Sequence, residues 1–165
     1  MIGTLSDEQI EWILKRNHLG RIACNEAKKS YIIPVNYVYD GNFIFVHSVE
    51  GMKTAMMRKN PSVCFEVEEV TSFTCWKCVV AMGEYQELHH ERDRMYAIKL
   101  FNENHIHIKF SKTSIPDPDT EKRLYAVSEE INRPLIYRIV LYEKTGRFEN
   151  EWWLNQILIR VNFYI

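Results

Sequence analysis

The chain has 165 residues, of which 46% are hydrophobic, 13% aromatic and 26% charged. This length accommodates one domain with a buried core, and the composition excludes a disordered chain. Its 21 basic and 22 acidic side chains give a net charge of -1, which provides no long-range field to hold nucleic acid or an anionic membrane. We therefore expect a single domain over residues 1–165 that holds any phosphate group locally.

The first twelve residues carry acidic side chains where a secretion signal needs a basic run followed by an apolar stretch. The longest apolar runs fall well short of the roughly 20 residues that span a bilayer. The irregular spacing of the cysteines does not indicate a disulfide framework; they are Cys24, Cys64, Cys75 and Cys78. We expect a cytoplasmic protein with free thiols and no membrane contact.

The first predicted element is a helix that begins at Asp7. Ser6 and Gln9 have the spacing of a capping box, in which each side chain binds the backbone N–H of the other residue. Gly20 lies where a left-handed residue would end the helix. An apolar stripe along this helix is formed by Ile10, Ile13 and Leu14.

Antiparallel strands are predicted next, because β-branched and aromatic residues alternate with polar ones at a period of two. The three runs are 21–24, 30–39 and 42–48. Asp40-Gly41, between the second and third runs, favours a tight hairpin turn, since both central positions of such a turn need positive φ. This part of the chain therefore predicts three antiparallel strands, the last two joined by a hairpin.

A short helix is predicted over residues 51–60, where Pro61 ends it. Its apolar face is formed by Met52, Ala55 and Met56. Two further strands are predicted over 61–70 and 72–88, the second interrupted by Gly83.

The remaining elements mix helix and strand. A helix is predicted over 89–102, with Met95, Ile98 and Phe101 on its apolar side, and a weaker helical stretch extends to residue 130. Strands are predicted over 136–142 and, as an edge strand or subunit contact, over the apolar tail 152–165. Together these elements predict a mainly β fold, an antiparallel barrel of about six to seven strands with flanking helices.

The segment 45–53, Phe-Val-His-Ser-Val-Glu-Gly-Met-Lys, runs from the end of a strand through a turn into a helix. The first N–H groups of a helix have no intrahelical partner and attract a phosphate. Ser48, Gly51 and Lys53 would add a hydroxyl, close backbone approach and a positive charge. The spacing by itself also allows a capped helix with a solvated lysine.

Six sequence pieces occur in the same order as in the FMN-binding split-barrel proteins related to pyridoxamine 5'-phosphate oxidase. They are residues 19–22 (LGRI), 33–40 (IPVNYVYD), 45–48 (FVHS) with Gly51 and Lys53, 58–65 (RKNPSVCF), 76–83 and 144–147 (KTGR). Over about residues 5–148 the chain resembles this family, and its nitroimidazole-resistance subgroup most of all.

The resemblance implies a homodimer with a flavin at the subunit interface, most simply FMN, with FAD as the alternative. It places the isoalloxazine ring beside Pro34, Val35, Asn36 and Tyr37. It also assigns His47 and Ser48 to the ribityl-phosphate arm, Met52 and Lys53 to the phosphate, and Cys78 and Val79 to the strand that approaches the flavin. His47 is the candidate catalytic residue, because an imidazole can donate or accept a proton near pH 7.

The resemblance further implies a flavin-dependent oxidoreductase. It would pass electrons from NAD(P)H or another donor to a small electron-poor acceptor such as a nitroimidazole, another nitroaromatic or a quinone. The basic substrate-phosphate residues of true pyridoxamine phosphate oxidases are not recognisable, so vitamin B6 oxidation is disfavoured. The alternatives are a non-catalytic flavin carrier or redox sensor, and a haem-binding split barrel.

A rival site of metal-ligating residue types is formed by Cys75, Cys78, His89, His90, His105 and His107. On a regular strand, positions three apart point to opposite faces, whereas the two cysteines of a zinc knuckle converge in a turn. The spacing therefore disfavours a metal centre, and we expect none.

Overall fold

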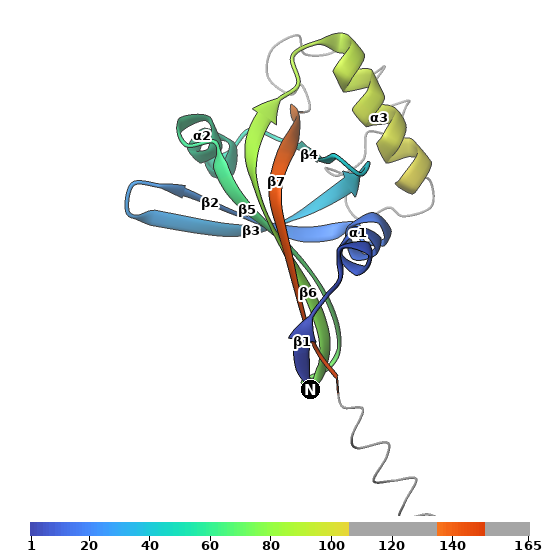
Figure 1. The fold of residues 1–165 in the computed structure, drawn as a ribbon. Helices are drawn as coiled ribbons and strands as arrows, with labels where there is room; N and C mark the ends of the chain where they lie inside the picture. The colour runs from blue at the N-terminus through green and yellow to red at the C-terminus, as the bar shows by residue number, and fades with distance from the viewer. Residues whose placement is uncertain (106–134, 151–165) are drawn as a thin grey trace, which may run out of the picture.

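The computed structural model describes residues 1–105 and 135–150. The elements in this part of the chain are β1 (Ile2–Thr4), α1 (Asp7–Arg16), β2 (Leu19–Glu26), β3 (Lys29–Tyr39), β4 (Phe43–Ser48), α2 (Met52–Lys59), β5 (Ser62–Ser72), β6 (Cys75–Glu87), α3 (Glu91–His105) and β7 (Leu135–Glu149) (Figure 1). The predicted helical stretch up to residue 130 and the predicted strand 152–165 lie outside the described residues.

The seven strands form one antiparallel sheet in the order β1-β7-β4-β3-β2-β5-β6. An additional pairing between β6 and β7, from Trp76↔Glu149 to Glu87↔Tyr137, closes the sheet into a barrel. This arrangement confirms the predicted mainly β, antiparallel barrel with flanking helices. The short strand β1, which pairs only with β7 in the described residues, was not predicted.

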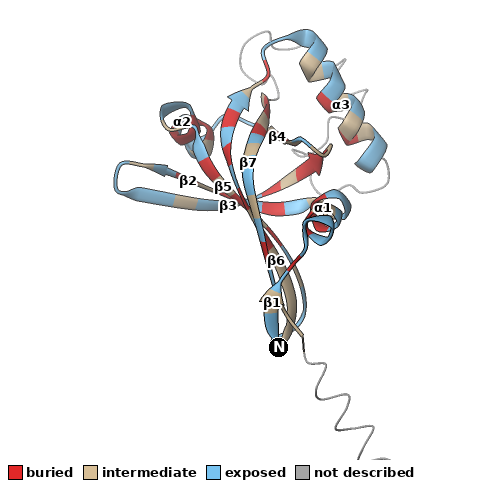
Figure 2. Ribbon diagram, viewed as in Figure 1, coloured by how far each residue is buried: buried red, intermediate tan, exposed pale blue. Residues whose placement is uncertain are grey.

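Two hydrophobic clusters stabilise the fold. Figure 2 marks the buried residues along the ribbon in red. The larger cluster fills the barrel and receives α1; its fully buried members include Tyr37, Phe65, Val79 and Tyr137. The smaller one lies between α3 and the outer side of β3, β4 and β7; it contains Val38, Phe45, Ala97, Phe101 and Ile136. The sheet is therefore covered on both sides near α3.

The beginning of α1 is as predicted, and its end is not. Gln9 N–H donates to Ser6 Oγ and Ser6 N–H donates to Gln9 Oε1, which completes the capping box. The helix ends at Arg16, and its C-cap Asn17 has φ -94. Gly20 belongs to β2, so its predicted role as the helix end is wrong. A Cβ on Gly20 would lie 2.3 Å from the Phe65 ring, so close packing accounts for this glycine.

The predicted hairpin between β3 and β4 is confirmed, with Tyr39 paired to Ile44. Its turn differs from the expectation, because Gly41 has positive φ (104) and Asp40 does not. Instead, Asp40 Oδ1 accepts hydrogen bonds from the N–H groups of Asn42 and Phe43, both at 2.8 Å. The turn is thus stabilised by the side chain of Asp40, whereas the prediction relied on a positive φ of its backbone.

Two helices bury faces that differ from the predicted ones. Of the predicted apolar face of α2, only Met56 is buried, while Met52 and Ala55 are exposed. The buried residues of α2 are Thr54, Met56 and Met57. In α3, Phe101 is buried and Ile98 half-buried as predicted, but Met95 is exposed and Ala97 takes the buried position.

Candidate functional site

The turn between β4 and α2 has an open approach to its backbone. Gly51 caps α2, its N–H donates to Thr54 Oγ1 at 3.0 Å, and Thr54 is fully buried. A Cβ added to Gly51 would meet no described atom within 4 Å. The first turn of α2 also contains no acidic residue. A small anion could therefore approach this helix start without a steric obstacle at Gly51 and without repulsion from an acidic residue of the first helical turn.

Lys53 supplies the positive charge of this turn. Its side chain is half-buried, and burial lowers the pKa of its ammonium group, an effect that the nearby Cys24 thiol partly opposes. Within residues 1–105 and 135–150, Lys53 forms no ion pair with a carboxylate. A partly desolvated cation without a counter-ion is costly, and a bound anion would offset that cost.

The predicted ring-binding residues of β3 point in two directions. Pro34 is exposed and Asn36 half-buried on the outer side of the barrel, whereas Val35 and Tyr37 belong to the interior cluster. The Tyr37 hydroxyl donates to the carbonyl of Leu14 at 3.0 Å, and burial raises the pKa of Tyr37. The side chains of Val35 and Tyr37 thus stabilise the barrel, and contact with a ligand outside it is left to their backbone.

His47 and Ser48 are neighbours on β4 with opposite orientations. The His47 ring is half-buried near α3, with its centroid 6.5 Å from that of Phe101. Ser48 is buried on the other side, and its hydroxyl donates to the Val49 carbonyl at 3.0 Å. The structure therefore brings His47 close to the helix α3, and its role as a proton donor or acceptor stays a prediction.

Cys78 and Val79 also face opposite sides of the barrel wall. Val79 is fully buried in the interior cluster. Cys78 is half-buried, and its thiol donates to Glu66 Oε1 at 3.5 Å. Burial, together with the negative charge of Glu66, raises the pKa of Cys78 to about 12. This thiol is therefore neutral near pH 7, and its contact with a flavin stays a prediction.

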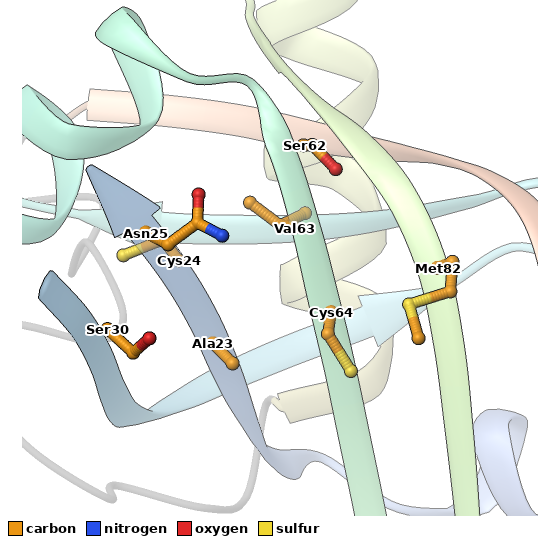
Figure 3. Close-up of a pocket in the computed structure, with 8 residues that line it drawn as sticks. All are labelled: Ala23, Cys24, Asn25, Ser30, Ser62, Val63, Cys64 and Met82. Atoms are coloured by element: carbon orange, nitrogen blue, oxygen red, sulfur yellow. The ribbon is translucent and has the colours of Figure 1, made fainter. Parts of the chain in front are cut away.

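A shallow hollow of about 220 Å³ lies on the barrel wall formed by β2, β3, β5 and β6 (Figure 3). Ala23, Cys64 and Met82 form one cross-strand row along it. The complete lining is Ala23, Cys24, Asn25, Ser30, Ser62, Val63, Cys64 and Met82. Ser62, Val63, Cys64 and Met82 fall in sequence pieces that resemble the family, but only the pairing register of the strands brings them together with the residues of β2 and β3.

The metal-site alternative finds no support in the described residues. Cys75 and Cys78 lie on β6, all four cysteines are free thiols as predicted, and no group of three or more potential ligands converges in the described ranges. His107 and the side chain of His105 lie outside them. Among the described helices, none has the length and apolar character needed to cross a membrane.

The closed antiparallel barrel with its flanking helices defines the split-barrel class that the sequence motifs resemble. The sequence matches the family described as Pyridoxamine 5'-phosphate oxidase over residues 6–148, and the chain belongs to this family.

Three relatives illustrate the match. An uncharacterised protein of Rhizobium meliloti is 34% identical over 103 residues, which cover 59% of this chain and 68% of the relative. The crystal structure of an FAD-binding protein from Mesorhizobium loti has 26% identity and a TM-score of 0.67, covering 92% of this chain and 98% of that one. A protein provisionally described as a 5-nitroimidazole antibiotic resistance protein, from Bacteroides thetaiotaomicron, shares the fold at 16% identity, with a TM-score of 0.65 and coverage of 90% and 89%.

Proposed function

We propose that this protein binds a flavin, with FMN as the cofactor and its phosphate held by the turn between β4 and α2. The observation that carries the proposal is Lys53, a half-buried ammonium group without a carboxylate partner in the described residues. The open space at Gly51 and the absence of acidic residues in the first turn of α2 fit a phosphate as well. The Mesorhizobium loti relative, described as FAD-binding, supports the cofactor class.

The residues of the chain would divide the work of binding. Lys53 would neutralise the phosphate, while Pro34 and Asn36 on the outer side of β3 would contact the ring. A bound flavin supplies hydride and electron transfer, and the protein orients it. The imidazole of His47 would donate or accept the proton that accompanies reduction of the acceptor. We propose an NAD(P)H-dependent reductase of small nitroaromatic acceptors, in line with the Bacteroides relative's description.

We extend the proposal to a homodimer formed through the outer wall of the barrel. In a single copy of the chain this wall carries apolar side chains that are exposed to water. Leu19 and Ile32 among them are 61% and 66% exposed. Met82 lines the adjacent hollow. A second copy would cover this surface and complete the flavin site. Sedimentation equilibrium should give a dimer for the wild type and a monomer for Ile32→Glu.

The experiment that tests the proposed function is a visible absorption spectrum of the purified protein, followed by chromatography of the cofactor released on denaturation. Flavin bands and released FMN are the expected result, and released FAD would assign the same turn to the inner phosphate of the larger cofactor. A Soret band would indicate haem and contradict the proposal. A colourless protein whose melting temperature FMN and FAD leave unchanged would also contradict it.

Turnover is tested separately by adding NADH or NADPH anaerobically and then a nitroimidazole. Bleaching of the flavin by the donor and its return with the acceptor are expected of a reductase. Bound flavin that neither nicotinamide reduces would instead identify a carrier or redox sensor.

A further inference from the structure

We propose that Arg58 is a positioning residue for the flavin phosphate, because it binds Glu50 and neutralises that carboxylate at the turn. The inference rests on the proposed function of the turn between β4 and α2. Glu50 lies in this turn, three residues before Lys53. An unpaired carboxylate so close to a phosphate site would repel the phosphate, or it would pair with Lys53 and so compete with the phosphate for this cation.

Arg58 binds Glu50 through two hydrogen bonds. Its Nη1 donates to Glu50 Oε2 at 2.9 Å, and its Nη2 donates to Glu50 Oε1. Thr54 Oγ1, which donates to the Gly51 carbonyl at 2.8 Å, lies 3.3 Å from the same carboxylate on the buried side of α2. Both oxygens of Glu50 are therefore in contact with side chains of α2.

A second carboxylate, on the barrel wall, fixes the orientation of Arg58. Arg58 Nε donates to Glu87 Oε1 and its Nη2 donates to Glu87 Oε2 at 3.2 Å. The Tyr85 hydroxyl also donates to Glu87 Oε1 at 2.6 Å, and the side chain of Glu87 is 12% exposed, against 61% for Glu50. The guanidinium is thus anchored to the largely buried carboxylate on β6, and it binds the more exposed carboxylate of the turn.

Arg58 also keeps both carboxyl groups in their ionised form. The hydrogen bonds from Arg58 are the main cause of the lowered pKa of both Glu50 and Glu87, so both are ionised at neutral pH. Removing Arg58 would leave two negative charges near the phosphate site without their cation. Repulsion from these charges would weaken the binding of a dianionic phosphate, whereas the binding of a neutral flavin would not change.

The test compares FMN with riboflavin, which has the same ring and ribityl chain without the phosphate. The variants are Arg58→Ala, Arg58→Lys and the double variant Arg58→Ala with Glu50→Gln. We expect Arg58→Ala to weaken FMN binding by about tenfold and riboflavin binding by less than about twofold. Arg58→Lys should keep most of the FMN affinity, because it keeps the charge but not the bidentate geometry. Adding Glu50→Gln to Arg58→Ala should restore most of the FMN affinity.

A purely structural role for Arg58 would give a different result, with both flavins weakened equally and no rescue by Glu50→Gln. Glu50→Gln alone keeps the inference testable if Arg58→Ala does not fold. It should bind FMN at least as tightly as the wild type, and weaker binding would overturn the inference. If the wild type prefers FMN and Lys53→Ala removes that preference while Arg58→Ala retains it, this inference fails and the proposed function stands. A wild type that binds no flavin overturns the proposed function itself.

Discussion

Lys53 and Arg21 both belong to motifs that the chain shares with its family, yet their surroundings are opposite. Arg21 Nη1 lies 3.0 Å from Glu66 and 2.8 Å from Glu68, and these ion pairs raise its pKa. Lys53 is half-buried, and burial lowers its pKa; no carboxylate of the described residues pairs with it. A basic residue therefore marks an anion site only where no carboxylate of the protein pairs with its charge.

Replacing these two cations by alanine should change the affinity for FMN very differently. Lys53→Ala should weaken FMN binding by about a hundredfold, since hydrogen bonds to charged groups contribute roughly 1.5–3 kcal/mol. Arg21→Ala should change it by less than about threefold, because Glu66 and Glu68 already neutralise the Arg21 charge. Quenching of FMN fluorescence on titration with each variant measures both constants.

Melting curves of the ligand-free variants provide the control for this comparison. Both should lie close to the wild type, which would show that a lost affinity does not come from unfolding. Equal losses of affinity in the two variants would refute the distinction between an available and a paired cation.

Two glycines extend the comparison from charge to space. A Cβ on Gly83 would lie 2.5 Å from Ile139 Cγ2 and 2.7 Å from the Val140 carbonyl, whereas a Cβ on Gly51 meets no described atom within 4 Å. Gly83→Ala should therefore lower the free energy of unfolding by about 1–3 kcal/mol. Gly51→Ala should leave stability nearly unchanged but weaken FMN binding by about fivefold, because the methyl group enters the proposed path of the ligand.

Urea unfolding and FMN titration of both alanine variants check this pair. If Gly51→Ala bound FMN as tightly as the wild type, the open space at the turn would not be where the ligand approaches.

The smallest expected effect concerns acid stability. Hydrogen bonds from Arg58 hold the pKa of Glu87 below its ordinary value of 4.5. A carboxyl group with a lowered pKa in the folded state stabilises the fold above about pH 4.5, and this stabilisation is lost as the pH falls through the lowered value. The free energy of unfolding should thus fall by roughly 1 kcal/mol more in the wild type than in Glu87→Gln between neutral pH and pH about 3.

Urea unfolding at several pH values provides this measurement. Parallel pH profiles for the two proteins would show that Glu87 does not contribute through its ionised form, and the anchoring of Arg58 would need another explanation.

The sequence predicted those features that depend on neighbours along the chain. The capping box of Ser6 and Gln9 and the hairpin at Gly41 are both local, and both are confirmed. The buried face of α2 was missed, because Thr54 is polar and its burial depends on the two hydrogen bonds it makes with the backbone of Gly51.

Long-range packing accounts for the other differences. A glycine at position 20 is typical of a helix end in the sequence. Its actual role, close packing against the Phe65 ring, depends on the pairing of β2 with β5. The contact between Arg58 and Glu87 joins residues 29 apart in the chain. Lys53 was found from its motif, whereas the absence of a carboxylate beside it in the described residues is a property of the fold.

The most direct test of the phosphate site is a side-by-side titration of the wild-type protein with FMN and riboflavin, repeated in the presence of inorganic phosphate. We predict that FMN binds at least about thirtyfold more tightly than riboflavin, that Lys53→Ala removes this advantage, and that inorganic phosphate weakens FMN binding while leaving riboflavin binding unchanged. Equal affinity for the two flavins in the wild type, or an advantage that survives in Lys53→Ala, would contradict the assignment of the turn between β4 and α2 as the phosphate site.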